Sequence, residues 1–166
     1  MQGTAMDDID LRILDLLQRD VGLSIAQVSE SVGLSPTPCW KRIQRLEASG
    51  VIEKRVALLN PEKLGLGITV FVTVETGDHS REWLEHFADF VAGMPEVLEL
   101  YRLAGDVDYM LRVVVPDMQS YDDFYKRLIA GLSLKKVTSR FAMERIKTST
   151  VLSITAPVKA PRSATA

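Results

Sequence analysis

The sequence predicts an α+β protein in which a small helical part precedes a mixed part. Two observations predict this class. Apolar residues recur at helical spacing between Met6 and Gly50, whereas from Val51 onward β-branched segments alternate with helical ones. The chain has 166 residues, 46% of them hydrophobic, which is enough to build one ordinary core or two small ones.

The composition excludes several classes of protein. The chain has no apolar run of roughly 18 residues, the length a transmembrane helix needs. Its acidic start lacks the features of a signal peptide. A single cysteine, Cys39, rules out an intrachain disulfide framework and fits a reducing compartment. We therefore expect a cytoplasmic protein with no membrane partner.

The first two helices are predicted from periodicity and end signals. Ile9, Ile13 and Leu16 with Leu17 form one apolar stripe, behind acids that favour a helix start. Ser24 and Gln27 have the spacing of a capping box, and Gly33 is a typical helix stop. Only a short turn then separates the second helix from the third.

The third helix begins near Ser35 to Thr37 and runs to about Ser49. Pro36 and Pro38 lie in its first turn, where missing N–H groups cost nothing and a fixed φ favours the helix. On a helical wheel, the inward positions are Cys39, Ile43 and Leu46. The start and the remaining faces carry the candidate DNA-binding residues, Ser35, Thr37, Trp40, Lys41, Arg42, Gln44 and Arg45, with Arg42 at the flank.

The charge distribution favours a polyanion as the partner of this helix. The net charge is −2, but residues 36–55 carry five bases against two acids. Lysine and arginine neutralise phosphates, while arginine and glutamine also read base edges. A recognition helix for double-stranded DNA is one interpretation, and a solvated basic face with Trp40 covering a neighbouring element is the other.

In the second, mixed part of the chain, the pattern predicts the order strand, helix, strand, strand, helix, strand, which is the ferredoxin-like order. The predicted segments are an extended stretch at 51–59, strands at 68–75, 97–104, 107–115, 137–147 and 150–154, and helices at 80–91 and 121–132. The middle two strands meet at a tight turn, Gly105-Asp106. Turn chemistry alone explains those two residues, but with Asp108 they also offer N–H donors and carboxylate acceptors to a zwitterion.

Three stretches together resemble the Lrp/AsnC family of bacterial and archaeal transcription regulators. They are IDLRILDLLQRD, VGLSPTPCWKRIQRLEASGVI and VALLNPEKLGLG, and GDVDYMLRVVVPD and MERIKTST match the family's C-terminal half. The resemblance runs from Met6 to about Ile154. Within the family, TPCWKR, PEKLGLG and HSREW are most similar to a branch of cysteine-responsive regulators.

The resemblance implies four parts. They are a winged helix-turn-helix DNA-binding domain at 6–55, a linker at 56–67, a ferredoxin-like effector-binding and oligomerisation domain at 68–155, and a flexible tail at 156–166. Members of the family form dimers that assemble further, often into octamers, and respond to amino acids.

The resemblance also implies an effector site between subunits. Carried over residue by residue, this site comprises Tyr101, Leu103, Gly105, Asp106 and Asp108, with Thr138 and Ser139 from a partner subunit. The family often has Pro-Gly-Val before the last of these strands and Thr-x-Thr within it. This chain instead has Leu132-Ser133-Leu134, then Val137 and Ser139, so the chemistry of that half of the site stays open.

An enzyme is the alternative class, because Lrp-like proteins of the siroheme decarboxylase type share this architecture. The C-terminal half offers no nucleophile and base at a suitable spacing. The histidines, His79 and His86, lie far along the chain from Cys39. The sequence therefore predicts no catalytic residue, no metal site and no cofactor.

Overall fold

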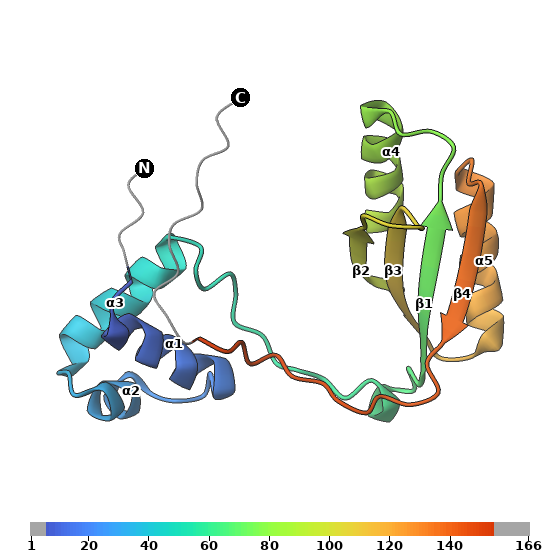
Figure 1. The fold of residues 1–166 in the computed structure, drawn as a ribbon. Helices are drawn as coiled ribbons and strands as arrows, with labels where there is room; N and C mark the ends of the chain where they lie inside the picture. The colour runs from blue at the N-terminus through green and yellow to red at the C-terminus, as the bar shows by residue number, and fades with distance from the viewer. Residues whose placement is uncertain (1–5, 155–166) are drawn as a thin grey trace. The chain divides into compact units, whose positions relative to one another are not determined.

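The protein, represented by a computed structural model that describes residues 6–154, divides into two compact units (Figure 1). Among the described residues, one unit contains 6–57 together with 147–154, and the other contains Leu58–Ile146. The predicted tail, 156–166, lies outside the described residues. None of the described helices is long and apolar enough to cross a membrane.

The first unit is built from α1 (Asp8–Arg19), α2 (Ile25–Val32) and α3 (Pro36–Ala48). The predicted ends of α2 are confirmed: Ser24 accepts a hydrogen bond from the Gln27 N–H, and Gly33 has a φ of 74°. The three helices enclose one hydrophobic cluster, whose buried members are Ile13, Val28, Val32, Cys39, Ile43 and Leu46.

Two segments predicted to be extended or strand-like belong to no strand. Neither residues 51–59 nor residues 150–154 pair with a strand in the described chain. The backbone of Leu152 is instead held by a side chain: its N–H donates to Gln18 Oε1 (2.8 Å), and its carbonyl accepts from Gln18 Nε2 (3.0 Å). The prediction of a strand at 150–154 is therefore wrong for this chain alone.

The second unit has the predicted order of elements. After a short 3-10 turn, η1 (Glu62–Leu64), it contains β1 (Ile68–Glu75), α4 (Arg81–Ala92), β2 (Val97–Arg102), β3 (Tyr109–Val115), α5 (Met118–Gly131) and β4 (Lys136–Phe141). The strands form one antiparallel sheet in the order β2-β3-β1-β4. α4 and α5 cover one face of this sheet (Figure 1).

Alternation along β1 separates the two faces of the sheet. Val70, Val72 and Val74 are fully buried and pack with Phe87 of α4 and Phe124 of α5. The residues between them point to the opposite face, where neither helix of the unit lies. That face leaves the half-buried Phe71 without a covering helix.

Two boundaries in the sheet differ from the predictions. β4 ends at Phe141 and does not continue to Lys147. β2 and β3 are joined by residues 103–108, which form a longer connection than the predicted tight turn. The Leu103 N–H donates to the Asp108 carbonyl (2.8 Å), while the Asp108 N–H donates to Val74 of β1 (3.0 Å). These bonds fix the base of the connection and leave Gly105-Asp106 at its tip.

Candidate nucleic-acid interface and effector loop

The start of α3 is set by its prolines. Ser35 occupies the N-cap position without a side-chain hydrogen bond, and Pro36 follows at the first helical position. The Ser35 carbonyl accepts the Cys39 N–H at 3.3 Å. The prolines thus fix φ in the first turn and remove two N–H groups from positions where an N–H has no partner within the helix.

The predicted orientation of α3 is confirmed by burial. Cys39, Ile43 and Leu46 are at most 2% exposed and pack in the cluster of the first unit. The other side presents Thr37, Trp40, Lys41 and Gln44 to solvent. Trp40 is 49% exposed and is not among the hydrophobic residues that pack against the cluster of the first unit. Its exposed ring adds contact area beside the polar groups.

Arg42 and Arg45 differ from these residues, because both point towards a carboxylate of α1. Arg42 Nη1 donates to Asp10 Oδ1 (2.8 Å), and Arg45 Nη2 donates to Asp10 Oδ2 (2.5 Å). Arg42 Nη1 also lies 2.7 Å from Asp7 Oδ2. Asp10 is fully buried, so the arginines compensate a charge that has left water.

Asp10 is the important residue of this unit that sequence reasoning missed. The helical spacing does indicate that Asp10 is buried, because it lies three residues before Ile13 and seven before Leu17, on the apolar side of α1. A carboxylate at such a position is rarely buried unless it is paired. The partner is not readable locally, because it comes from a helix more than thirty residues further on.

The N-terminus of α1 and the thiol of α3 show how these surroundings shift pKa values. Hydrogen bonds from the Asp10 N–H and from Arg42 hold the pKa of Asp7 below its usual value. Burial raises the pKa of the Cys39 thiol, with the nearby charge of Arg42 acting in the opposite direction. The thiol is thus a buried core group, as predicted.

The hairpin between β2 and β3 contains acids in two different environments. Asp108 is partly buried, and its Oδ2 accepts the Thr76 N–H at 2.8 Å, which ties the hairpin to the end of β1. His79 Nδ1 lies 3.9 Å from the other oxygen of Asp108. Gly105 and Asp106 are exposed at the tip. Asp106 is therefore the acid whose side chain is presented to solvent.

Tyr101 and Leu103 lie at the end of β2 and just beyond it. The Tyr101 hydroxyl donates to Glu99 Oε2 (2.9 Å), and Glu99 pairs with Arg112 of β3 (2.5 Å). The Arg112 bond is the main reason that the pKa of Glu99 is lowered. Leu103 is 37% exposed, which leaves an apolar group close to the tip of the hairpin.

Thr138 and Ser139 lie on β4, and the fold does not bring them to the hairpin of the same chain. They pair with Thr73 and Val72 of β1, while β3 lies on the other side of β1. The Ser139 hydroxyl is bonded to the Tyr121 hydroxyl of α5. Within this chain, β1 therefore lies between β4 and the two strands of the hairpin.

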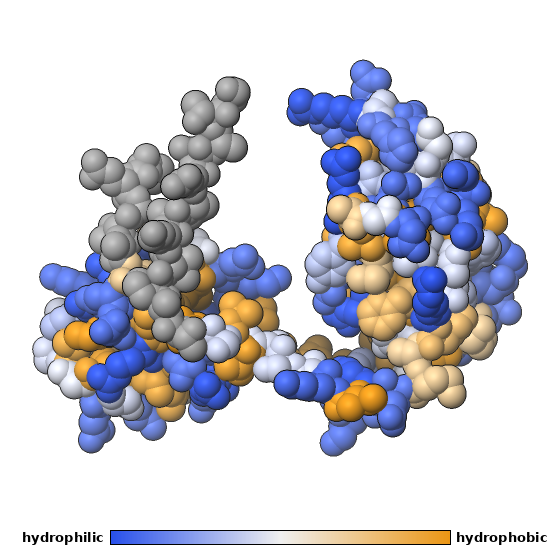
Figure 2. Space-filling view, in the orientation of Figure 1, coloured by the Kyte–Doolittle hydropathy of each residue, from blue (hydrophilic) through white to orange (hydrophobic). Residues whose placement is uncertain are grey.

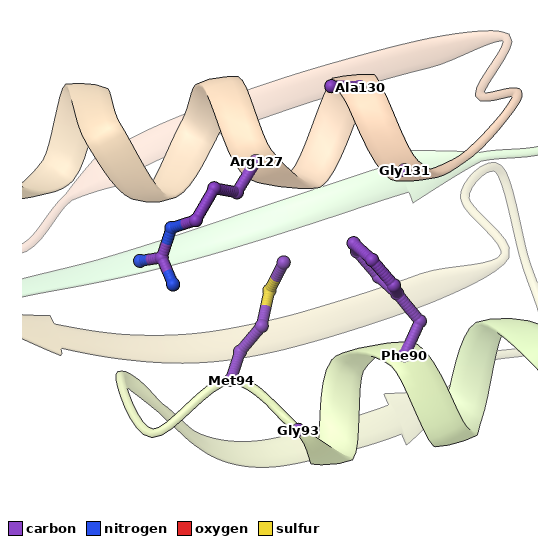
Figure 3. A pocket seen from close by; sticks show the side chains of 6 residues that line it. All are labelled: Phe90, Gly93, Met94, Arg127, Ala130 and Gly131. Carbon is purple, nitrogen blue, oxygen red and sulfur yellow. The ribbon is translucent and has the colours of Figure 1, made fainter.

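The surface of the second unit is hollowed beside α4 and α5 and beside β4. A groove of about 450 Å³ between α4 and α5 is lined by Phe90, Gly93, Met94, Arg127, Ala130 and Gly131, with Met94 between the guanidinium and the ring (Figure 3). A second hollow of about 360 Å³ includes Ser139 among its lining residues, next to Tyr121 and Phe141. The groove contains none of the predicted effector residues. No group of three or more metal-ligating side chains occurs between residues 6 and 154.

The chain matches two known families over most of its described length. Residues 6–53 match the winged helix-turn-helix DNA-binding family, and residues 69–152 match the Lrp/AsnC ligand binding domain. The first match covers α1, α2 and α3, and the second covers the sheet with its helices.

Individual proteins of this kind are similar over nearly the whole chain. The DNA-binding transcriptional activator DecR of Escherichia coli is 52% identical over 150 residues, 90% of this chain and 99% of DecR. A crystal structure of an AsnC family transcriptional regulator from Agrobacterium tumefaciens has a TM-score of 0.86 and 54% identity, and covers 89% of this chain and 97% of that one. A Neisseria meningitidis transcriptional regulator in complex with L-Met has a TM-score of 0.84 and 34% identity, over 89% of this chain and 96% of that one.

Proposed function

This chain belongs to the Lrp/AsnC family of transcriptional regulators, and we propose that it binds operator DNA through α3 and responds to an amino acid bound between subunits. The exposed, proline-started face of α3 is the observation that carries the DNA-binding half. The chromosome is the proposed target, so the proposed place of action is the cytoplasm.

The contact surface proposed for DNA is made by Thr37, Trp40, Lys41 and Gln44. Lys41 supplies a cation for phosphate. Gln44 carries the amide donor and acceptor that read adenine, and its Nε2 donates to Glu47 Oε2 at 2.9 Å, a bond that it would exchange for the base. The N-terminal turns of a recognition helix are those that reach base edges. A helix whose start is fixed by prolines aims these side chains in one direction.

Selection of bound duplexes from a random pool tests this half. We expect the full chain to enrich a two-fold symmetric site, with half-sites about 34–36 Å apart or a multiple of that. Gln44→Ala should relax selection at one position of each half-site, at a cost of about 1–3 kcal/mol in discrimination. Gln119→Ala, which removes an exposed glutamine of α5, is the control. Enrichment of no sequence by the wild type would contradict DNA recognition.

The proposed binding of an amino acid depends on the tip of the hairpin between β2 and β3. Asp106 supplies an acceptor for an ammonium group, and the backbone N–H groups of the tip supply donors for a carboxylate. The L-Met complex of the Neisseria regulator supports an amino acid as the class of ligand. Thr138 and Ser139 of a second chain would complete the site, with Tyr101 and Leu103 near its edge.

A thermal-shift panel of the twenty common amino acids identifies the effector. A ligand at 100 times its Kd adds about 2.7 kcal/mol of stability, which is readily measured. Asp106→Ala should abolish the response without unfolding the protein, whereas Asp89→Ala, which removes an exposed acid of α4, should leave it unchanged. A full response in Asp106→Ala would remove the hairpin tip from the proposed site.

We propose a homo-oligomer, at least a dimer, as the working form. The sheet face opposite α4 and α5 presents Phe71, Met110 and Tyr101 without a covering helix from its own unit. Apolar side chains also reach the surface near η1 (Figure 2), where Leu64 is 59% exposed. A second copy would cover such surfaces and repeat α3 at a second half-site. Light scattering of the purified chain, compared with Phe71→Glu, tests this proposal.

The proposed activity is regulation and not catalysis. The similar proteins are named as transcriptional regulators. In the second unit, His79 and His86 are both exposed, whereas a catalytic base works best in a site that shields it from water. Binding of a tetrapyrrole, detected as a Soret absorption band after incubation with the purified protein, would instead favour the decarboxylase alternative.

A further inference from the structure

We infer that Asp10 is a specificity-determining residue for DNA binding, because it neutralises Arg42 and Arg45 and leaves Lys41 as the main phosphate-binding cation of α3. The inference rests on the proposed DNA-binding function and concerns how that surface is tuned. Asp10 acts only through these two arginines, since it has no exposed surface with which to contact DNA.

The geometry around Asp10 occupies both of its oxygens. Oδ1 accepts Arg42 Nη1 at 2.8 Å, and Oδ2 accepts Arg45 Nη2 at 2.5 Å. Oδ2 also accepts the Asp7 N–H at 3.1 Å, which closes the capping box at the start of α1. The same carboxylate thus caps the N-terminus of α1 and binds two arginines of α3.

Asp7 adds a second negative charge to this cluster. Its Oδ1 and Oδ2 lie 2.9 Å and 2.7 Å from Arg42 Nη1. Arg42 keeps only 25% of its side chain exposed, while Arg45 keeps 41%. The two acids and two arginines sum to no net charge. Both carboxylates bind Arg42 through its Nη1, and Arg45 is neutralised at the edge of the exposed face.

Lys41 has a different environment. It lies near the centre of the exposed side of α3 and takes part in no ion pair between residues 6 and 154. Thr37, Trp40 and Gln44 beside it are uncharged. The surface offered to DNA is thus rich in neutral groups and poor in free positive charge.

This distribution determines how binding depends on salt. Each phosphate neutralised by a free cation releases counterions and steepens the dependence of log K on log[salt] by about 0.9, whatever the base sequence. A guanidinium already neutralised by a buried carboxylate adds little to this term. By lowering the sequence-independent attraction, Asp10 raises the share of binding that comes from base contacts.

An alternative role for Asp10, in which it orients Arg45 towards a phosphate, makes a different prediction. If Arg45 were oriented by Asp10 for phosphate contact, removal of Arg45 would lower the salt slope as removal of Lys41 does. If Asp10 neutralises Arg45, only the lysine substitution lowers the slope. The salt slope therefore separates the two roles, whereas a loss of stability accompanies both.

The experiment uses the full chain with its selected operator and with a duplex of scrambled sequence, followed by fluorescence anisotropy over a series of salt concentrations. Lys41→Gln should lower the slope by about 0.9 for each copy of α3 on the DNA. Arg45→Gln should leave the slope on both duplexes unchanged, as should Arg19→Gln, which removes an acid-paired arginine of α1 outside the proposed interface. Asp10→Asn should steepen the slope and tighten binding to the scrambled duplex more than to the operator.

The outcomes distinguish this inference from the proposed function. An equal loss of slope in Arg45→Gln and Lys41→Gln overturns the neutralising role of Asp10 while leaving DNA binding intact. Circular dichroism reports whether Asp10→Asn is folded, and the Arg45→Gln and Lys41→Gln pair decides the question if it is not. Absence of any binding by the wild type overturns the proposed function itself.

Discussion

At the scale of single residues, the two acids of the β2–β3 connection perform different tasks although only Val107 separates them. Asp108 accepts the N–H of Thr76 at 2.8 Å, and Thr76 is 4% exposed. Asp106 projects at the tip. We predict that Asp108→Ala lowers the free energy of unfolding by about 1–3 kcal/mol, because a buried N–H loses its acceptor.

Urea denaturation of the purified variants measures this difference. Asp106→Ala should lie within about 0.5 kcal/mol of the wild type, as expected for an exposed residue. Equal destabilisation by the two substitutions would show that the Thr76 bond contributes little. The comparison also explains why Asp106→Ala is the cleaner probe of the effector.

Cys39 gives a second prediction at this scale. The thiol is fully buried, and burial raises its pKa. Because the thiolate is the reactive form, we expect Cys39 to react with a disulfide reagent at pH 8 far more slowly in the folded protein than in denaturant. Absorbance of the released thiolate follows the reaction. Rapid modification of the folded protein would contradict the burial of this side chain.

The same helix shows what single-residue reasoning from sequence achieves. Cys39, Ile43 and Leu46 were correctly placed inward, because a 3.6-residue period fixes one face of a helix. The period says nothing about what lies beside the flank. Arg42 and Arg45 meet Asp10 only through the packing of α1 on α3, so their pairing could not be read from α3 alone.

At the scale of elements, the N-terminus of α1 combines a helix cap with a contact between helices. Asp7 accepts the Asp10 N–H at 2.9 Å and also binds Arg42 of α3. The backbone bond is the largest reason that the pKa of Asp7 in the folded protein lies below 3.8, its value in an unfolded chain. The cap therefore carries a defined dependence of stability on pH.

The direction of that dependence follows from linkage. As the pH falls, the unfolded chain binds a proton at Asp7 more readily than the folded protein does. The ionised Asp7 side chain therefore stabilises the folded protein fully at a pH well above 3.8. This stabilisation is lost as the pH falls through the lowered pKa of Asp7 in the folded protein. We predict that Asp7→Asn reduces the loss of stability on acidification from about pH 5 to about pH 3. Urea denaturation at each pH measures it, with Asp8→Asn as a control of equal charge. An unchanged pH profile in Asp7→Asn would remove the cap as its source.

The elements also show where sequence patterns succeed and fail. β1 was predicted with its observed bounds, because eight residues rich in β-branched side chains meet partners on both sides. Residues 51–59 and 150–154 carry similar patterns but have no strand partner in the described chain. A pattern states that a segment suits a strand, while pairing requires a neighbour that the local sequence does not specify.

At the scale of the whole molecule, the chain contains two hydrophobic cores that share no residue. One lies among α1, α2 and α3, and the other lies between the sheet and α4 with α5. Separate cores are expected to unfold as separate cooperative units, because cooperativity depends on shared packing. This division suits a regulator in which one unit binds DNA and the other binds the effector.

We therefore predict two thermal transitions that respond to different changes. Ile43→Ala and Leu111→Ala remove side chains that are at most 1% exposed, and each should cost about 2–5 kcal/mol in its own unit. Differential scanning calorimetry should show Ile43→Ala lowering one transition and Leu111→Ala lowering the other. An amino-acid effector should raise only the transition that Leu111→Ala lowers, because a ligand stabilises the state that binds it. If both substitutions move one common transition, the two units unfold as a single cooperative structure, and effector binding is then coupled to α3 through shared stability.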